Sequence, residues 1–263
     1  MKRLAVLGHP VSHSKSPAMH NAALEDLDLA GEWSYEAIDV PVEELIEFIA
    51  GMPGEGFAGA NVTVPHKQAA LIAADDATLA AREIGAANTL TFGPEGMVAD
   101  NTDAPGLLAA LGESPRGKRA LVLGAGGAAR AVLWALNGEG ALASVWNRTE
   151  TKAVELVTAL GGEPVTEPDA GDFDLIVNAS AAGLGGQGGL GDLPIDPGAF
   201  RSDQTVVDMV YGDKPSTLLE AAEAAGAQTV DGLEILVRQG ALSFEIWTGR
   251  KASLDVMRAA ARG

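Results

Sequence analysis

Short apolar runs and helical patterns alternate along the chain, and this alternation predicts an α/β protein. In the first part of the sequence, strands are expected at residues 2–8, 33–40 and 57–64, where apolar runs of strand length occur. Residues 86–92 and 97–100 have the pattern of a further hairpin. Helical patterns lie between these strands, so the first part of the chain is expected to fold as one α/β domain.

The first helix has a start signal that can be assigned to single residues. Ser16 is followed by Pro17, and a serine N-cap followed by proline at the first helical position is a common beginning of a helix. We therefore expect Ser16 to be the N-cap. A second helical pattern covers residues 42–50.

A turn-rich segment at residues 112–118 (GESPRGK) marks a break, and a second series of strands and helices follows it. Strands that alternate with helices in this way form a parallel sheet with right-handed crossovers. We expect a Rossmann-type doubly wound domain at residues 106–231, after an α/β substrate domain at residues 1–105. Residues 232–263 are expected to return to the first domain, with a cleft between the two. The expected strands of the second domain are residues 119–123, 143–146, 174–178 and 205–209.

Composition narrows the functions that this architecture can have. The chain contains no cysteine, which excludes disulfides, thiolate nucleophiles and cysteine-ligated zinc. No apolar run approaches the ~18 residues of a membrane span. The apolar run at residues 4–7 is too short for a signal peptide. We therefore expect a cytoplasmic protein with no membrane partner.

The formal net charge of −18 bears on the partners of this protein. A surface with this charge repels phosphate backbones, so we expect no nucleic-acid partner. A small-molecule substrate is expected instead, and a homodimer stays open as an assembly. If the ligand carries phosphates, the acidic chain needs a local group of cations to hold it.

Residues 124–129 (GAGGAA) have the pattern G-x-G-x-x-A directly after a predicted strand and before a predicted helix. In this context Gly124 permits the tight turn, Gly126 lets a pyrophosphate approach the backbone, and Ala129 keeps helix and strand close. The helix N-terminus adds free N–H groups. The alternative is a glycine turn used for packing alone. The residues expected to bind a dinucleotide here are Gly124, Ala125, Gly126, Gly127 and Ala128.

The end of the next strand indicates which dinucleotide binds. Enzymes that use NAD place Asp or Glu there to hold the ribose 2′-hydroxyl. This chain instead has Asn147, Arg148 and Thr149, with Lys152 four residues past Arg148. Arg148 and Lys152 are suited to bind a 2′-phosphate, although they could also be ordinary solvated charges. We therefore expect NADP as the cofactor, bound in part by these four residues.

Clusters of polar residues follow several strands of the first domain. They lie at residues 8–17, 61–67, 88–89 and 100–103. In open α/β sheets ligands bind beyond the carboxyl ends of the strands, where some of these clusters fall. Their hydroxyls, amides, lysine and carboxylate suit a small polyhydroxylated carboxylate as the substrate.

With these motifs the chain resembles the shikimate dehydrogenase family. The resemblance runs nearly end to end, and its most specific motifs are NVTVPHK and the HSKSP segment. It implies reversible, NADPH-dependent reduction of 3-dehydroshikimate to shikimate, a step in chorismate and aromatic amino-acid biosynthesis. The matching segments are residues 8–21 (GHPVSHSKSPAMHN), 61–67 (NVTVPHK), 88–89, 101–103, 124–129, 147–149 and 232–249 (GLEILVRQGALSFEIWTG).

The resemblance also implies roles for single residues. Lys67 and Asp103 would form the catalytic pair, with Lys67 delivering a proton to the carbonyl oxygen as charge develops there. Ser14 and Ser16 would bind the substrate carboxylate, with Thr63 and Tyr211 nearby. The ring hydroxyls would be held by Asn61, Asn88 and Gln239, and the cofactor further contacted by Ser180, Met209 and Gly232. Ser180 stands where the family commonly has threonine, and it keeps the hydroxyl.

Other interpretations of these residues exist. Lys67 could be a solvated charge, and Asp103 could cap the helix expected at residues 105–111. The four histidines lack the spacing and the companion carboxylate of a metal site, so we expect no metal. A quinate/shikimate or aminoshikimate dehydrogenase would share the fold and the Lys–Asp pair. A non-catalytic NADP-binding regulator would be expected to lack one of the two residues.

Overall fold

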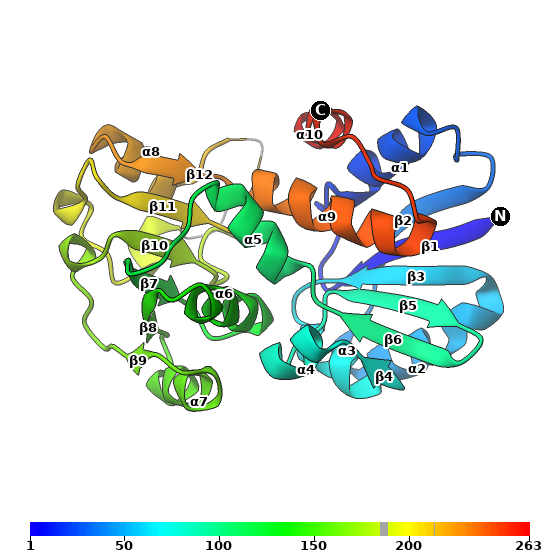
Figure 1. The fold of residues 1–263 in the computed structure, drawn as a ribbon, viewed down its shortest axis with the longest axis horizontal. Coiled ribbons are helices and arrows are strands. Elements are labelled where there is room, and N and C mark those ends of the chain that lie inside the picture. The colour runs from blue at the N-terminus through cyan, green and yellow to red at the C-terminus, as the bar shows by residue number, and fades with distance from the viewer. Residues whose placement is uncertain (185–188, 213) are drawn as a thin grey trace. The chain divides into compact units, whose positions relative to one another are not determined.

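The computed structural model describes residues 1–184, 189–212 and 214–263, which form two compact units (Figure 1). Unit 1 comprises Met1–Gly106 and Leu236–Gly263, and unit 2 comprises Leu107–Ile235. Helices α5 (Asp103–Leu111) and α9 (Gly232–Thr248) each begin in one unit and end in the other. Both units combine a sheet with helices, which confirms the predicted α/β class. Among the described residues, no helix is both long and apolar enough to cross a membrane.

Unit 1 contains a mixed sheet of strand order β2-β1-β3-β5-β6-β4. Strands β1 to β3 run parallel, whereas β5 and β6 form the predicted antiparallel hairpin, which pairs with β3. The elements of this unit, besides parts of α5 and α9, are β1 (Lys2–Gly8), α1 (Ser16–Asp26), β2 (Trp33–Asp39), α2 (Leu45–Gly51), β3 (Phe57–Val62), α3 (Lys67–Ala73), β4 (Asp76–Ala77), α4 (Leu79–Ile84), β5 (Thr89–Gly93), β6 (Gly96–Asp100) and α10 (Leu254–Arg262).

The start of α1 differs from the prediction. Lys15, not Ser16, is the N-cap, and its side chain forms no cap hydrogen bond. Ser16 is the first helical residue, and its N–H donates to Ser14 Oγ at 3.2 Å. The hydroxyl that accepts a hydrogen bond at the start of α1 therefore belongs to Ser14, two residues before the predicted N-cap.

Unit 2 contains a sheet whose paired strands are all parallel. Its strand order is β9-β8-β7-β10-β11-β12, which is the 3-2-1-4-5-6 order of the Rossmann fold when the strands are counted within the unit. The elements are β7 (Arg119–Leu123), α6 (Gly127–Gly138), β8 (Leu142–Trp146), α7 (Glu150–Leu160), β9 (Glu163–Pro164), β10 (Leu175–Asn178), β11 (Thr205–Asp208), α8 (Thr217–Ala224) and β12 (Gln228–Val230).

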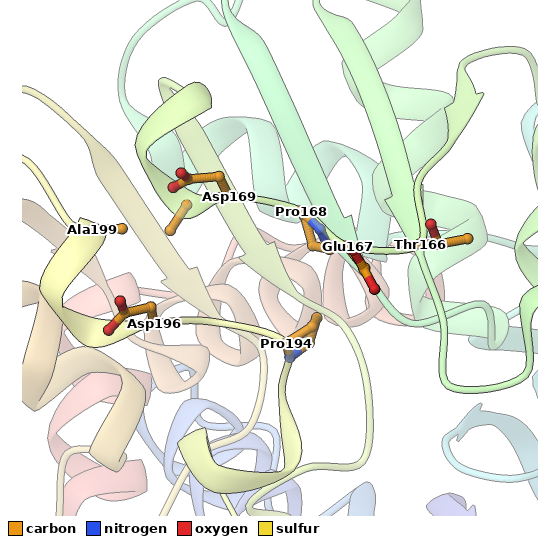
Figure 2. A pocket seen from close by; sticks show the side chains of 8 residues that line it. Thr166, Glu167, Pro168, Asp169, Pro194, Asp196 and Ala199 are labelled. Carbon is orange, nitrogen blue, oxygen red and sulfur yellow. The ribbon is translucent and has the colours of Figure 1, made fainter.

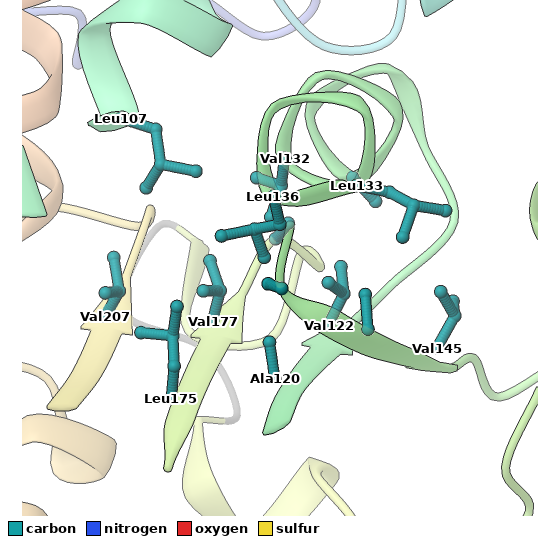
Figure 3. Packing of buried hydrophobic residues seen from close by; sticks show 14 of the residues in the cluster. Leu107, Ala120, Val122, Val132, Leu133, Leu136, Val145, Leu175, Val177 and Val207 are labelled. Carbon is teal, nitrogen blue, oxygen red and sulfur yellow. The ribbon is translucent and has the colours of Figure 1, made fainter. Parts of the chain in front are cut away.

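Both faces of the unit 2 sheet are covered, which explains why β7 is apolar from Ala120 to Leu123. Ala120 and Val122 face a cluster that includes Val132 and Leu136 of α6 (Figure 3). The alternate residue Leu121 faces a second cluster, which includes residues of α8. Because the sheet is buried on both sides, the strand shows a continuous apolar run instead of alternation. The run ends at Leu123, where the glycine turn begins.

His20 lies in the core of unit 1 and is fully buried. Its ring stacks on Tyr35 with 4.1 Å between the ring centroids and 2° between the planes. Among the described residues, neither ring nitrogen of His20 has a hydrogen-bond partner. Burial lowers the pKa of His20 to about 3, so the imidazole is neutral in the folded protein.

Acid is therefore expected to destabilise the fold through His20. The unfolded chain takes up a proton below its ordinary pKa of 6.5, whereas the folded protein does not until about pH 3. The stabilisation is complete above the unfolded pKa and falls by about 1.4 kcal/mol per pH unit below it. Between pH 7.5 and 5, we expect the free energy of unfolding in urea to fall by about 2 kcal/mol more in the wild type than in His20→Phe. Equal pH dependence of the two proteins would contradict this account.

Candidate active site

An ion pair between Lys67 and Asp103 lies at the centre of the candidate site in unit 1. Lys67 is the first residue of α3 and Asp103 the first residue of α5. Lys67 Nζ donates to Asp103 Oδ2 at 2.6 Å, and only 11% and 7% of the two side chains are exposed. The fold thus brings together two residues that are 36 positions apart in the sequence.

The segment before Lys67 is anchored by His66. Its Nε2 lies 2.7 Å from the carbonyl oxygen of Val40, to which the neutral imidazole donates. Burial lowers the pKa of His66, which favours this neutral form. Since His66 immediately precedes α3, this contact fixes the point from which the Lys67 side chain extends.

Asp103 is held by two asparagines. Asn101 Oδ1 accepts from the backbone N–H of Asp103 at 3.1 Å and of Ala104 at 3.3 Å, so Asn101 satisfies the start of α5. Asn88 Nδ2 donates to Asp103 Oδ1 at 3.0 Å. The carboxylate of Asp103 is therefore occupied by Lys67 and Asn88, and the alternative in which Asp103 caps the helix does not hold.

The orientation of the Asn88 amide is fixed by the backbone. Asn88 Oδ1 accepts from the N–H of Thr102 at 2.7 Å, which turns Nδ2 toward Asp103 and Gln239. Gln239 Oε1 accepts from Asn88 Nδ2 at 2.9 Å. Gly106 lets Gln239 come this close to α5, because a Cβ atom at residue 106 would lie 2.8 Å from Gln239 Cβ.

Asn61 is 5% exposed and is hydrogen-bonded on both sides of its amide. Its Oδ1 accepts from the Tyr35 hydroxyl at 2.8 Å, and its Nδ2 donates to Ser243 Oγ at 2.9 Å. Neither Tyr35 nor Ser243 is predicted from the sequence as a partner of Asn61. Ser243 follows Gln239 by four positions and so lies on the same face of α9, a signal that could have identified it.

The predicted carboxylate-binding residues lie near the ends of β1 and β3. Ser16 is buried, and Ser14 and Thr63 are half-buried. A Cβ atom at Gly8 would lie 2.5 Å from Thr63 Cγ2, so only glycine permits this approach of Thr63 to the end of β1. Tyr211 belongs to unit 2, where it follows β11.

In unit 2 the predicted cofactor residues gather at the carboxyl ends of the strands. Gly124 follows β7 with a φ of 115°, and a Cβ there would lie 2.9 Å from the carbonyl oxygen of Ala179. Glycine is therefore required at this turn. Gly126 is the N-cap of α6 without a side-chain cap, and a Cβ there would meet nothing within 4 Å. The backbone at the start of α6, where Gly127 and Ala128 follow, is thus open to a ligand.

The predicted 2′-phosphate residues lie where β8 leads into α7. Arg148 and Lys152 are exposed, and Thr149 is the N-cap of α7 without a side-chain cap bond. Asn147 Nδ2 donates to the carbonyl oxygen of Thr149 at 2.9 Å, which stabilises the turn. No carboxylate occurs at residues 147–149, and Glu150 begins α7 directly after them.

Ser180 is oriented by residues at the ends of β10 and β11. Its Oγ donates to Asn178 Oδ1 at 2.7 Å, and Asn178 Nδ2 donates to Asp208 Oδ1 at 2.9 Å. Burial raises the pKa of the Asp208 carboxyl group. After β11, a Cβ at Gly232 would lie 2.5 Å from the carbonyl oxygen of Met209, so these two predicted residues are in close contact.

A hollow in unit 2, of about 390 Å³, shares no residue with the predicted site. Figure 2 shows that it is lined by Glu167, Asp169 and Asp196, among other residues. Asp169 and Asp196 each accept a hydrogen bond from the backbone N–H two residues later, so both carboxylates cap the N-termini of short 3₁₀ helices. Among the described residues, no group of three His, Asp or Glu side chains is placed to hold a metal ion.

Comparison with known proteins gives the family. The profile of the shikimate dehydrogenase substrate binding domain matches residues 6–90, and that of the shikimate 5′-dehydrogenase C-terminal domain matches residues 232–262. A protein of Methanocella arvoryzae named shikimate dehydrogenase (NADP(+)) is 45% identical over 98% of this chain and 97% of its own length. The chain belongs to the shikimate dehydrogenase family.

Solved structures of family members have the same fold. Shikimate 5-dehydrogenase from Thermus thermophilus, in complex with NADP(H) and shikimate, has a TM-score of 0.90 and 42% identity, covering 100% of this chain and 99% of that one. The 5-ketofructose reductase of Gluconobacter sp. strain CHM43 has a TM-score of 0.87 and 31% identity, covering 99% and 97% of the two chains. The fold of the shikimate dehydrogenase family is therefore shared by a reductase of a different name.

Proposed function

We propose that this protein reduces 3-dehydroshikimate to shikimate reversibly with NADPH, in the biosynthesis of aromatic amino acids. The observation that carries the proposal is the ion pair between Lys67 Nζ and Asp103 Oδ2, at 2.6 Å, in a chain of the shikimate dehydrogenase family. Unit 1, with its hydroxyls and amides, is the substrate-binding and catalytic unit of this proposal. Unit 2, with its Rossmann strand order, is the unit that binds NADP.

The residues of unit 2 fit a phosphorylated dinucleotide. The open backbone at Gly126 and the N-terminus of α6 suit a pyrophosphate, whose charge the helix dipole favours. Arg148 and Lys152 supply cations for a 2′-phosphate, in a protein whose net charge is −18. Ser180, Met209 and Gly232 complete the proposed set of cofactor residues. When bound, NADPH supplies the hydride that reduces the keto carbon.

Lys67 moves the proton of the proposed reaction. In reduction its ammonium group donates a proton from Nζ to the carbonyl oxygen that becomes the hydroxyl, and in oxidation the amine takes this proton back. The same group stabilises the negative charge that develops on the oxygen. Asp103 orients Nζ through Oδ2, while Asn88 holds Oδ1.

The remaining polar residues of the proposed site would hold the substrate. Ser14 and Ser16, with Thr63 and Tyr211, are proposed to bind the carboxylate. Asn61, Asn88 and Gln239 are proposed to hold the ring hydroxyls. Support comes from the hydrogen bonds of Asn88, which lies between Asp103 and Gln239. Hydrogen-bonding groups fixed in this way lose little entropy when a substrate binds.

Replacement of Lys67 tests the mechanism. We expect Lys67→Ala to lower kcat for shikimate oxidation at least ~10²-fold, the low end of general acid–base effects. Lys251→Ala, which removes an exposed lysine of the same unit, should leave turnover unchanged. The measurement is NADPH absorbance with shikimate or quinate as substrate and NADP or NAD as cofactor. A Lys67→Ala variant within about threefold of wild-type turnover, or a wild type that prefers quinate or NAD, would contradict the proposal.

Two glycines of the turn after β7 provide a matched test of cofactor binding. Ala at residue 126 would fill the space that the pyrophosphate needs without touching the protein, since nothing lies within 4 Å of its Cβ. We expect Gly126→Ala to unfold near the wild-type temperature but to bind NADP at least ~10-fold more weakly in calorimetry. Gly124→Ala should lower the unfolding temperature, because φ is 115° there and the Cβ would press against backbone. Wild-type affinity in Gly126→Ala would exclude this turn as the pyrophosphate site.

A further inference from the structure

The buried hydroxyl of Ser243, on α9, lies within hydrogen-bonding distance of four polar groups of unit 1. Ser243 is fully buried, and its Oγ lies 2.9 Å from Asn61 Nδ2, 2.9 Å from Thr89 Oγ1 and 3.1 Å from Thr102 Oγ1. It also donates to the carbonyl oxygen of Gln239 at 3.2 Å. One hydroxyl thus joins β3, β5, the residue before α5 and helix α9 within unit 1.

Asn61 is fixed from its other side by Tyr35. The Tyr35 hydroxyl, on β2, donates to Asn61 Oδ1 at 2.8 Å. The backbone carbonyl oxygen of Asn88 accepts from Asn61 Nδ2 at 3.0 Å and can only accept, so it fixes the orientation of the amide, and the hydroxyls of Tyr35 and Ser243 complete its bonds. Tyr35 itself is 3% exposed and is stacked on His20, so its ring is held in place.

The hydrogen bonds continue from Ser243 to the catalytic carboxylate. Thr89 Oγ1 donates to Asn88 Oδ1 at 3.1 Å, and Thr102 Oγ1 lies 2.9 Å from Asn88 Nδ2. Asn88 Nδ2 then donates to Asp103 Oδ1, and Asp103 Oδ2 accepts from Lys67. We call Tyr35, Asn61, Thr89, Thr102 and Ser243 the hydroxyl network.

Fold stability alone does not explain the hydroxyl network. Its members are at most 5% exposed, and the hydrogen bonds among them replace those that water would make, so their net contribution to stability is small. Replacement of both partners of such a bond by apolar groups of the same shape can be nearly neutral for stability. A fully bonded polar network does provide a single fixed orientation for each member, which catalytic groups require.

We propose that Tyr35 and Ser243 are positioning residues, which act through Asn61 and Asn88 to hold the Asp103 carboxylate, and through it Lys67 Nζ, in the orientation for proton transfer. The inference rests on the proposed function, because it assigns the proton transfer to Lys67. Neither residue is assigned a contact with substrate or cofactor. Their effect is therefore on the reacting geometry, where small displacements of a catalytic group reduce the rate strongly.

The expected signature is a loss of kcat with little change in KM. Ser243→Ala removes one acceptor of Asn61 Nδ2 and one hydrogen-bond partner of each threonine, which lets the network shift. We expect kcat to fall at least about fivefold, the rate equivalent of one hydrogen bond, with KM within about threefold of the wild type. Tyr35→Phe deletes one hydroxyl while keeping the stacked ring, and should lower kcat in the same way.

A matched control on the same helix separates positioning from helix stability. Thr248 Oγ1 donates to the carbonyl oxygen of Phe244, four residues earlier, as Ser243 does to Gln239. Thr248→Ala therefore removes the same kind of bond outside the hydroxyl network and should leave kcat unchanged. Ser243→Thr restores the hydroxyl and should recover most of the turnover lost in Ser243→Ala.

The assay uses purified full-length protein and whichever of shikimate and quinate the wild type oxidises faster. A wild type that fails with shikimate contradicts the proposed function, and the positioning role is still tested with the other alcohol. The positioning role is overturned if Tyr35→Phe and Ser243→Ala stay within about twofold of wild-type kcat, if Thr248→Ala loses as much, or if only KM changes. If Ser243→Ala does not fold, Tyr35→Phe alone decides by the same criterion.

Discussion

An ammonium group and a carboxylate held 2.6 Å apart, with 11% and 7% of their side chains exposed, are the interaction on which the rest of this structure depends. Removal of such charges from water is costly unless their remaining hydrogen-bonding positions are satisfied. Asp103 begins α5, where the helix dipole favours a carboxylate, and Asn88 occupies its second oxygen. Lys67 begins α3, where the dipole disfavours a cation, so the stabilisation of the ammonium falls mainly to Asp103. The groups around the pair therefore stabilise the carboxylate, and the carboxylate in turn stabilises the ammonium group.

In both units, proposed site residues lie in the segments that follow the carboxyl ends of strands. Parallel strands direct their carboxyl ends to one edge, and the residues that follow them are free of the ladder and available to a ligand. In unit 1 the segments after β1 and β3 carry Ser14, Ser16, Thr63 and Lys67. In unit 2 the turns after β7, β8, β10 and β11 carry the glycine turn, the cation pair, Ser180 and Met209. Chemistry is thus concentrated where strands end, while the apolar strand interiors form the cores.

The sequence predicts those features that short-range chemistry determines. The apolar run into Gly124 and the hairpin at β5 and β6 are local signals, and each has its counterpart in the structure. The predicted N-cap of α1 was wrong because Ser14 and Ser16 both lie close to the helix start, and their spacing does not show which hydroxyl accepts the N–H. The bonds of Ser243 and Tyr35 to Asn61 are not predicted from the sequence, because the partners are distant along the chain. Ser243 is 182 positions from Asn61. The spacing of Ser243 from Gln239 places both on one face of α9, but only the folded chain shows that Ser243 is bonded to Asn61.

The most direct test of the account asks whether Lys67 and Asp103 work as one unit. The measurement is kcat for shikimate oxidation with NADP in the wild type, Lys67→Ala, Asp103→Asn and the double variant. Because Asp103 acts through Lys67, the account predicts that the double variant is about as slow as the slower single variant. Losses that multiply in the double variant would show that the two residues act independently, and would contradict the central claim.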